Sequence, residues 1–528
     1  MPRLVDVSVP APGRWDAVVV GSGIGGLTAG ALYATTGRRV LVLERNASFG
    51  GAASVYRVGN LTIEASLHEL DGLDDDDVKA PIFDRLGVRD AIEFVDVGDL
   101  YEVRSRLLEE PFRMPHGVEA ATAALAARFP RHARSFHTYF ARLLAVRRVY
   151  TYVGRSRAKP RWWRILDAPL FPWRTRALVR HGKASLADVL GSAVADDEPA
   201  KLALAAHIGY YGDDARRLWF PFWAVAQGAY HAGGGHYPRG GSKRLAEHLI
   251  SVIRAAGGEA RAGRAVTAIE VEHGRTAGVA HTGADGDEPE RERAPVVFGN
   301  AAPAVLAELL PSSARAAFVA AYEDLAPSVS LFTLALGLDR RPREVGIAGW
   351  STVLFPDWMR TLAVMPQNTT LLREPPRGRI PYLVVVDYNA ADSGLTPEPP
   401  HLLTVTGVDR GANWEEDPDG YQERRARWTE AIVAALEREY PGLAAAVVQR
   451  ELTTGRSVAS YLNAPDGAVY GFATEPPRKG RLVRSRERTA IPGLYLASAY
   501  TRFGGYTGSI MGGTLAFSAA LKDARSAA

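Results

Sequence analysis

A glycine-rich run near the start of the chain has the spacing of a nucleotide-binding turn. The residues Gly21-Ser22-Gly23-Ile24-Gly25-Gly26 satisfy the pattern G-x-G-x-x-G. In such a turn the first glycine permits the tight bend, and the second lets the backbone approach a pyrophosphate. The third glycine lets the following helix pack closely on the preceding strand. Free N–H groups at that helix N-terminus favour an anion. The run therefore predicts a dinucleotide site that includes Gly21, Gly23, Ile24, Gly25 and Gly26.

The segments around this run are those needed to position it. The apolar run Ala17–Val20 precedes the glycines, and a helix-length stretch covers 27–36. A second apolar run, Val40–Leu43, ends at Glu44. Short apolar runs of this kind are typical of buried strands in a parallel sheet. Glu44 stands where an acidic residue accepts hydrogen bonds from the adenosine ribose, and Arg45 is assigned to the same site.

A glycine pair narrows the choice of dinucleotide. Gly50 and Gly51 come six residues after Glu44, and Ala52 follows them. This extension resembles FAD enzymes of the glutathione-reductase-like superfamily, in which the glycine pair approaches the cofactor, whereas NAD dehydrogenases do not usually carry it. The alternative is an ordinary loop with two glycines. The resemblance implies FAD as the cofactor, with Gly50, Gly51 and Ala52 at its site.

The middle of the chain supplies a second set of cofactor residues. The run 237–242, Tyr-Pro-Arg-Gly-Gly-Ser, precedes a stretch whose apolar residues fall on one helical face. Ser242 is predicted to cap the start of that helix and Gly257 its end. Strand-like stretches then return the chain to the cofactor domain. In related folds the position of Val266 meets the adenine side through its backbone. The residues assigned to the cofactor here are Val266, Asn300 and Ala301.

The C-terminal part supplies a third set. The apolar run 491–497 leads to glycines at 504, 505, 508, 512 and 513, and a helix follows to the end of the chain. A strand that delivers a glycine-rich turn and a helix N-terminus suits the flavin and its ribityl chain. The residues assigned here are Ala499, Gly505, Thr507 and Gly508.

With these residues in view, the chain resembles the phytoene desaturase, carotenoid isomerase and retinol saturase family of flavoproteins. The resemblance is specific in four segments: 21–51, 237–279, 467–472 (Gly-Ala-Val-Tyr-Gly-Phe) and 491–517. It implies FAD and an apolar, often polyene, small-molecule substrate. Members of the family desaturate, saturate or isomerise carbon–carbon double bonds.

Two departures separate this chain from parts of that family. Amine oxidases and bacterial phytoene desaturases usually have arginine after the glycine pair, where this chain has Ala52. Together with the stretch 64–68, Glu-Ala-Ser-Leu-His, this favours the saturase and isomerase side. The family usually shows Gly-Asp after the last strand, where this chain has Ser498 and Ala499. The usual acidic contact to the flavin is therefore missing from that position.

Several polar residues could move a proton while a flavin exchanges hydride with the substrate. The candidates are His68, Glu69, His231, His236, Tyr237 and Tyr506. His68 is the first choice because it follows the cofactor loop at a distance that could return it to the flavin. For each residue, the alternative is a hydrogen-bonded structural role. The acidic run 74–77 is interpreted as a solvated loop and helix start. His132 and His137 lack a set of metal-binding partners, and no metal is predicted.

Composition narrows the class of protein. The chain has 528 residues, a formal net charge of +4 and no cysteine, which excludes disulfide scaffolds, iron–sulfur clusters and dithiol redox chemistry. No zinc-ligand spacing, RNA-binding motif or basic tail suggests nucleic acid. The first 14 residues lack the apolar core of a signal peptide, and no apolar run reaches membrane-spanning length. We expect a cytoplasmic protein, with peripheral contact to the inner face of the membrane left open; the oligomeric state is not readable.

These patterns together predict an α/β fold. A glutathione-reductase-like, FAD-binding Rossmann domain is expected from 1–75, 226–310 and 466–528. An inserted α+β substrate domain with a helical cap, of the amine oxidase and phytoene desaturase type, is expected from 76–225 and 311–465. Strand-like runs at 329–338, 382–388 and 402–408 suggest a mixed sheet beneath its helices.

One segment of the substrate domain is basic and aromatic. Residues 147–183 carry eleven lysines or arginines against one acid, Asp167, with tryptophan, tyrosine and phenylalanine interleaved. Such a composition suits a membrane interface, where rings lie among lipid headgroups and cations meet anionic lipid. The slightly favoured alternative is a solvated basic face with its aromatic rings packed inward, or an oligomer contact.

Three functions fit the sequence. The first is a flavin-dependent desaturase, saturase or isomerase of an apolar alkene. The second is a flavin amine oxidase, which would need an aromatic cage around the amine and which Ala52 disfavours. The third is a non-catalytic lipid-binding protein similar to the Rab escort and GDP-dissociation-inhibitor family. The retained glycines and Glu44 disfavour this third function.

Overall fold

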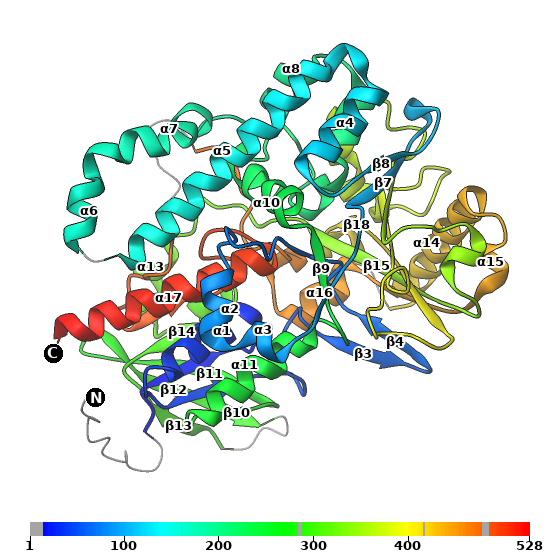
Figure 1. Cartoon of the computed structure of the whole chain (residues 1–528). Coiled ribbons are helices and arrows are strands. Elements are labelled where there is room, and N and C mark those ends of the chain that lie inside the picture. Colours follow the sequence, from blue (N-terminus) through cyan, green and yellow to red (C-terminus); the bar gives the residue numbers. More distant parts are fainter. Residues whose placement is uncertain (1–13, 160, 284–287, 416–417, 478–484, 528) are drawn as a thin grey trace.

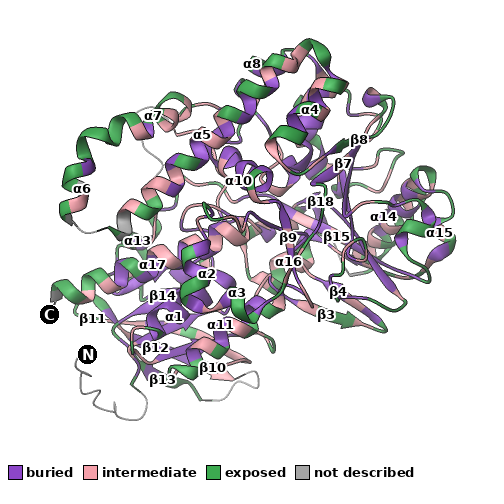
Figure 2. Cartoon of the chain, in the orientation of Figure 1, coloured by how far each residue is buried: buried purple, intermediate pink, exposed green. Residues whose placement is uncertain are grey.

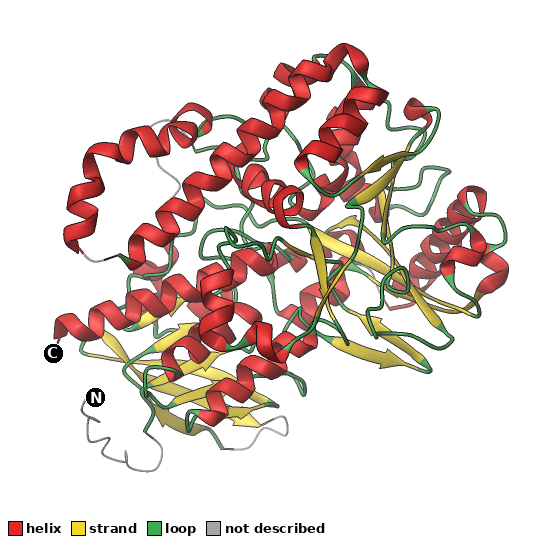
Figure 3. Cartoon of the chain, viewed as in Figure 1, coloured by secondary structure: helices red, strands yellow, loops and turns green. Residues whose placement is uncertain are grey.

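The computed structural model describes residues 14–159, 161–283, 288–415, 418–477 and 485–527. Two units with separate sheets are joined by several crossings of the chain (Figure 1). Strand interiors are buried and most exposed residues lie on helices and loops (Figure 2). Both units mix helices and strands, as Figure 3 shows, in agreement with the predicted α/β class.

The first unit is built on a five-stranded parallel sheet with the order β10-β2-β1-β14-β20. Its central strands are fully buried because they have cover on both faces. Helices pack on one face and a three-stranded antiparallel sheet packs on the other. The strands are β1 (Ala17–Val20), β2 (Val40–Leu43), β10 (Glu259–Arg261), β14 (Val297–Gly299) and β20 (Leu494–Leu496). The covering elements are α1 (Ile24–Ala34), α11 (Lys243–Ala255), α17 (Gly505–Ala527), β11 (Arg264–Glu272), β12 (Arg275–Gly283) and β13 (Glu290–Arg293).

The second unit is built on a seven-stranded sheet with the order β19-β15-β18-β17-β16-β7-β8. Its β7–β16 pair is parallel and its other pairs are antiparallel, so the sheet is mixed. The strands are β7 (Tyr101–Arg104), β8 (Phe112–Met114), β15 (Ser330–Leu338), β16 (Ser351–Leu354), β17 (Leu383–Asp387), β18 (His401–Asp409) and β19 (Val447–Thr453). Two distant parts of the chain, 101–114 and 330–453, therefore share one sheet.

Helices cover both faces of this second sheet. Helix α14 (Pro418–Glu439) packs on one face. The other face carries α4 (Val118–Arg128), α5 (Ala133–Ala158), α8 (Leu186–Val194) and α10 (Phe220–Gly233). A small sheet, β5-β9-β6, ties the end of the first cofactor segment to the start of the second. Its strands are β5 (Leu70–Asp71), β6 (Phe94–Asp96) and β9 (Gly235–Pro238).

The acidic run 74–77 is a loop that precedes α2 (Ala80–Leu86), and Asp75 and Asp76 are exposed, as the sequence suggested, but Asp74 and Asp77 are not solvated. Asp77 is buried and forms a 2.8 Å ion pair with Lys79, whose side chain is fully buried. Asp74 pairs with Arg147 of α5 at 2.5 Å. A buried lysine needs nearby carboxylates to offset its lost hydration. These acids therefore anchor the chain where the two units meet, a contact that local sequence cannot reveal.

Candidate functional site

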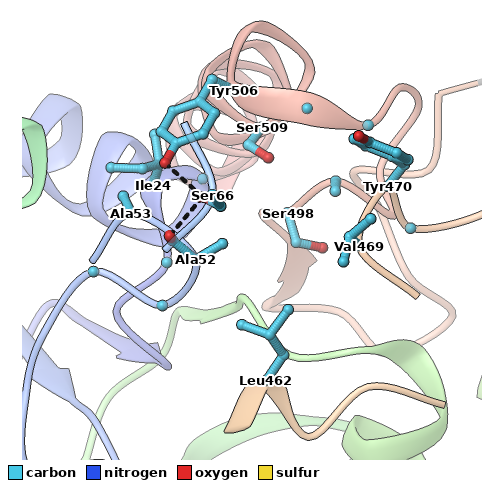
Figure 4. A pocket seen from close by; sticks show the side chains of 18 of the residues that line it. Ile24, Ala52, Ala53, Ser66, Leu462, Val469, Tyr470, Ser498, Tyr506 and Ser509 are labelled. Atoms are coloured by element: carbon cyan, nitrogen blue, oxygen red, sulfur yellow. Dashed lines mark hydrogen bonds between the residues drawn. The ribbon is translucent and has the colours of Figure 1, made fainter. Parts of the chain in front are cut away.

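One large cavity of about 1310 Å³ is lined by residues of both units. Its wall includes the glycine turn after β1, the end of β2, the start of α17, and side chains from β15 and β18. Figure 4 shows Ile24, Ala52 and Tyr506 on one side of this space, with Tyr470 and Leu462 across from them. The carboxyl ends of parallel strands meet at one edge of a sheet, which is where such folds bind their ligands.

Every residue assigned to the cofactor from the sequence lines this cavity, with the exception of Gly26. The lining residues from that set are Gly21, Gly23, Ile24, Gly25, Glu44, Arg45, Gly50, Gly51, Ala52, Val266, Asn300, Ala301, Ala499, Gly505, Thr507 and Gly508. The three separated sequence segments are therefore brought together, and their roles toward the cofactor stay a prediction.

The glycine turn leaves no room for larger side chains. Gly21 has a positive φ of 90°, which favours glycine. A Cβ atom on Gly23 would lie 2.4 Å from Asn300 Nδ2, and one on Gly26 would lie 2.7 Å from Asn300 Cβ. The N–H of Gly26 donates to Asn300 Oδ1 at 2.9 Å. Gly26 thus packs α1 on the sheet, as predicted, while Asn300 braces the turn in addition to lining the cavity.

Glu44 joins two of the cofactor loops. Its Oε2 accepts hydrogen bonds from the N–H (2.8 Å) and the Oγ–H (2.6 Å) of Ser22. The Oγ of Ser22 in turn accepts from the N–H of Gly50 at 3.0 Å. Glu44 Oε1 accepts from the N–H of Asn46. The carboxylate therefore holds the turn and the glycine pair in register while it lines the cavity. Arg45 also lines the cavity, but its guanidinium donates to the Ser460 carbonyl.

Two helix N-termini open into the same cavity. Helix α17 crosses α1 so closely that a Cβ on Gly513 would lie 2.1 Å from the Gly25 carbonyl oxygen. A Cβ on Gly25 would lie 2.6 Å from the Ala497 carbonyl oxygen, at the end of β20. Free N–H groups at both helix starts favour negatively charged or carbonyl-bearing groups. A long cavity with a pyrophosphate-type turn and a second helix N-terminus fits FAD.

The loop after the glycine pair is tied to the start of α17. The Oγ–H of Ser66 donates to the Ala52 carbonyl at 2.7 Å and also lies 2.9 Å from the Tyr506 hydroxyl (Figure 4). Burial raises the pKa of Tyr506 far above its ordinary value, so this hydroxyl stays protonated. Ser498 and Ala499 both line the cavity and bring no carboxylate to the end of β20. The structure therefore has no acidic side chain at the position where the family usually has Gly-Asp.

His68 and Glu69 lie side by side in sequence and both line the cavity. The Nδ1 of His68 is 2.7 Å from the Tyr210 hydroxyl, and its Nε2 is 3.3 Å from the Thr406 hydroxyl. Burial lowers the pKa of His68 to about 4. Burial raises the pKa of Glu69 to about 8. At neutral pH the histidine is therefore an uncharged base and the glutamic acid an uncharged acid.

The carboxyl group of Glu69 has one oxygen in use. Its Oε2 accepts a hydrogen bond from Trp350 Nε1 at 3.2 Å, while Oε1 has no hydrogen-bond partner within the described residues. An unpaired polar atom in so buried a place costs free energy unless a ligand completes it. Glu69 Oε1 is therefore available to form a hydrogen bond with a ligand in the cavity.

Three other predicted residues do not line the cavity. The hydroxyl of Tyr237 donates to Glu64 Oε2 at 2.6 Å, so it serves a buried network. His231 packs edge-on against Phe140 with 4.7 Å between ring centroids, and burial lowers its pKa to about 3. His236 lies on β9. Since none of the three lines the cavity, the structure gives no support to a catalytic role for His231, His236 or Tyr237, and those roles stay a prediction.

Ser242 also differs from its predicted role. It occupies the N-cap position of α11, but its side chain makes no cap hydrogen bond. Its N–H and Oγ–H donate instead to Glu64, at 2.8 and 2.6 Å. These donors, with Tyr237, satisfy a buried carboxylate at the cavity wall. Gly257 follows the helix with a positive φ of 81°, as expected for a helix end.

Sequence reasoning missed several polar residues of the cavity wall. Glu64, Asp71, Tyr210 and Thr406 all line it. Glu64 lay inside a stretch singled out for its resemblance, but nothing marked its side chain. Asp71 accepts a hydrogen bond from Thr507 Oγ1, which links the first and last cofactor segments. Tyr210 and Thr406 belong to the second unit and carry no local motif, so only the tertiary structure could find them.

One cluster of metal-type ligands lies on the antiparallel sheet of the first unit. Within the described residues, His281, Glu290 and Glu292 could hold an ion together. Glu292 is already engaged, because it accepts from Trp15 Nε1 at 2.8 Å and pairs with Arg261 at 2.6 Å. The absence of a metal from this protein stays a prediction.

The chain is similar to known proteins in both sequence and fold. Residues 19–86 match the family described as an NAD(P)-binding Rossmann-like domain. The chain is 26% identical to all-trans-retinol 13,14-reductase of Macaca fascicularis, over 97% of this chain and 86% of that protein. It is 24% identical to the chloroplastic prolycopene isomerase of Daucus carota, over 91% of this chain and 76% of that protein. The structure of cyclohexylamine oxidase from Brevibacterium oxydans covers 97% of this chain and 99% of its own, with a TM-score of 0.57 and 15% identity.

These comparisons confirm the resemblance and the fold class predicted from the motifs. The relatives by sequence are a retinol reductase and a carotenoid isomerase, and they match most of this chain rather than the glycine turn alone. The fold is the Rossmann-containing architecture of amine-oxidase-type flavoenzymes. A flavin cofactor is therefore indicated, and its identity as FAD is part of the proposal that follows.

Proposed function

From the homology of this chain with the retinol saturase and carotenoid isomerase family of oxidoreductases, we propose that it is an FAD-dependent enzyme of carbon–carbon bonds. Its substrate is an apolar molecule with conjugated double bonds, which it desaturates, saturates or isomerises. The observation that carries the proposal is that one cavity is lined both by the dinucleotide turn and by an acid–base pair beside apolar walls.

The walls of the cavity support an apolar substrate. Apart from the glycine turns, the lining is mostly aliphatic and aromatic, and the second unit contributes much of it. Examples are Tyr211, Phe222, Val225, Leu331, Val469, Tyr470 and Phe503. Such a surface binds a long hydrocarbon by excluding water and offers few polar partners. The names of the relatives, a retinol reductase and a prolycopene isomerase, agree with this substrate class.

The acid–base pair has a role in this chemistry. A bound flavin supplies hydride exchange with a carbon of the substrate, and a neighbouring carbon then has to gain or lose a proton. Glu69, protonated at neutral pH, can donate that proton from Oε1, and uncharged His68 can accept one through the Tyr210 hydroxyl. Two adjacent groups with pKa values displaced in opposite directions are typical of acid–base assignments.

The competing functions differ in what they require of the cavity. An amine oxidase has to orient an amine, and its resemblance to this chain lies in the fold alone, at 15% identity for the cyclohexylamine oxidase. A lipid-binding protein without flavin would have no need of the tight glycine turn, whose Gly21, Gly23 and Gly26 are all retained. The flavin content and the substrate panel below separate these cases.

The first test is the visible spectrum of the purified protein. A flavin spectrum, with FAD identified by mass spectrometry after release from the denatured chain, is the expected result. A colourless protein that cannot be reconstituted with FAD would overturn the proposal and favour the lipid-binding alternative.

The second test follows the flavin anaerobically with polyenes and amines. Bleaching by a polyene shows hydride removal and sets the direction as desaturation. Reoxidation of chemically reduced enzyme by an alkene shows saturation, and a change of double-bond geometry without net bleaching shows isomerisation. Bleaching by amines alone would contradict the proposed substrate class and establish an amine oxidase.

A further inference from the structure

Exposed large apolar side chains gather on one short segment of the molecule. This segment, named here the exposed arm, comprises α6 (Arg161–Asp167), a 3₁₀ turn (Ala168–Leu170) and α7 (Phe171–His181). It stands out beyond α5 in Figure 1, and Figure 2 shows most of it as exposed. Its exposed large apolar residues are Trp162, Ile165, Leu166, Leu170, Phe171, Trp173 and Val179. Within the described residues, no other segment exposes so many.

Three of these side chains form an outward-facing apolar stripe on α6 with helical spacing. Trp162, Ile165 and Leu166 stand at positions i, i+3 and i+4 and are 63, 66 and 71% exposed. In a water-soluble helix such a stripe normally faces the core. The alternative favoured from the sequence has the aromatic rings of this segment packed inward. For Trp162, Phe171 and Trp173, which are exposed, that alternative is wrong.

A polar clamp fixes the outward orientation. The carboxylate of Asp167 is buried, accepts a hydrogen bond from the Tyr152 hydroxyl of α5, and pairs with Arg174 Nη1 of α7 at 2.6 Å. The guanidinium of Arg174 also lies 5.2 Å from the Tyr152 ring centroid. The one acidic group of 147–183 is thus turned inward, toward α5 and α7, while the apolar stripe is exposed.

Exposed cations flank the stripe. Lys159, Arg176, Arg180 and Lys183 are exposed, and no exposed acidic residue lies among residues 147–183. The guanidinium of Arg176 lies 4.4 Å from the Trp173 ring centroid. Apolar and aromatic side chains bordered by lysine and arginine match the boundary between anionic headgroups and acyl chains. The side chains of Arg157, Arg161 and Arg164, also in the basic run, lie outside the described residues.

The exposed arm is continuous with the cavity wall. Helix α5, to which the arm is clamped, contributes Tyr150, Val153 and Gly154 to the lining of the cavity. The Tyr150 hydroxyl accepts from Arg502 Nη2 at 3.4 Å, next to the start of α17. One helix therefore connects the outward apolar stripe to the space where an apolar substrate would bind.

We propose that the exposed arm docks in the plane of an anionic lipid bilayer, with its apolar stripe among the upper acyl chains and its cations among the headgroups. The arm lies on the membrane without crossing it: no helix in the described part of the chain is long and apolar enough to span one. A lipophilic substrate can then pass between the bilayer and the cavity beside α5.

The test uses the full-length protein and vesicles, and needs neither flavin nor turnover. Co-sedimentation is measured with vesicles of phosphatidylcholine alone and of phosphatidylcholine with phosphatidylserine. We expect binding that is stronger on the anionic vesicles and weakened by salt. The double variant Leu166→Glu, Trp173→Glu should weaken it at least about tenfold. The double variant Arg180→Gln, Lys183→Gln should weaken anionic binding roughly fivefold per cation removed.

The matched control is Val448→Glu, which alters an apolar residue that is 62% exposed on β19, away from the arm in sequence. It should bind vesicles as the parent protein does. Equal vesicle binding by parent and Leu166→Glu, Trp173→Glu would overturn the proposal, as would no binding by the parent. A parent that is dimeric by light scattering and becomes monomeric only in that variant would show that a second copy covers the stripe instead. None of these outcomes depends on whether the proposed reaction is correct.

Discussion

Two adjacent side chains, His68 and Glu69, show how much burial alone can change acid–base behaviour. Both lie in the same cavity wall, yet burial lowers the pKa of the histidine to about 4 and raises that of the glutamic acid to about 8. The cause is shared, because a low-dielectric environment disfavours the charged form of either group. The pair is thereby kept uncharged over the neutral range without any ion pair.

Glu69→Gln should change how stability depends on pH. Between the ordinary value of 4.5 and about 8, the unfolded chain releases a proton that the folded chain keeps. The free energy of unfolding of the parent should therefore fall, relative to the variant, by about 1.4 kcal/mol per pH unit as pH rises through this window. Urea denaturation across the window measures the free energy of unfolding of both proteins. The difference between them should be independent of pH below pH 4.5, change through the window, and become constant again above pH 8. Parallel curves for the two proteins would show that Glu69 is ionised when folded.

Glu44→Ala should weaken flavin binding. The substitution removes the acceptor that holds Ser22 and, through it, the N–H of Gly50. Loss of hydrogen bonds to a charged acceptor costs about 1.5–3 kcal/mol, so FAD affinity should fall roughly 10- to 100-fold. Fluorescence titration of the apoprotein with FAD measures it. Glu44→Gln keeps one acceptor oxygen and should lose less; unchanged affinity in Glu44→Ala would reject the role given to this carboxylate.

At the scale of elements, the crossing of α1 and α17 is the contact on which the cofactor site depends. It brings the first and last cofactor segments together through glycines that leave no space between backbones. Small residues at such a crossing set the distance between helix axes, since any Cβ would force the helices apart. Gly25 and Gly513 are therefore packing residues, and Gly25 also lines the cavity.

Gly513→Ala tests this crossing. The new Cβ would lie 2.1 Å from the Gly25 carbonyl oxygen, which cannot move without shifting α1. We expect a loss of about 1–3 kcal/mol in the free energy of unfolding, as for other overpacked sites, measured by urea denaturation. Gly191→Ala in α8 is the matched control, because no atom lies within 4 Å of its added Cβ. That control should be neutral or gain about 0.5–1 kcal/mol; equal behaviour of the two variants would contradict the packing argument.

At the scale of the whole molecule, the cavity lies between the two units, and both contribute to its wall. Strands β15 and β18 of the seven-stranded sheet and the turns of the parallel sheet line the same space. A ligand there contacts both units, so its binding free energy stabilises the pair and not one unit alone. The buried Asp71–Lys79–Asp77 cluster lies at the same junction.

FAD should therefore raise the thermal stability of the whole chain in one transition. At a concentration 100 times its Kd, the stabilisation should be about 2.7 kcal/mol. Calorimetry of apoprotein with and without FAD measures it, and NAD serves as the control that should give no shift. A shift with NAD but not with FAD would contradict the cofactor assignment, and two separate transitions with FAD would contradict the coupling of the units.

The sequence by itself determined the cofactor half of this protein. The glycine turn, Glu44, the glycine pair and the C-terminal glycine-rich turn are local patterns, since phosphate approach and tight turns act on residues close in the chain. That is why every assigned cofactor residue except Gly26 lines one cavity, and why the predicted helix start differs from α1 by only three residues. The strand runs of the second sheet were also readable, because burial on both faces leaves apolar runs.

Only the tertiary structure decided which polar residues face the cavity. His231, His236 and Tyr237 follow or precede a glycine turn, yet none of them lines the cavity, whereas Tyr210 and Thr406 reach it from segments with no motif. The sequence also could not predict the ion pairs of Asp74 and Asp77 or the outward-facing apolar stripe of the exposed arm. In each case the deciding contacts join residues far apart in sequence, and burial and ion pairing depend on those distant partners rather than on local pattern.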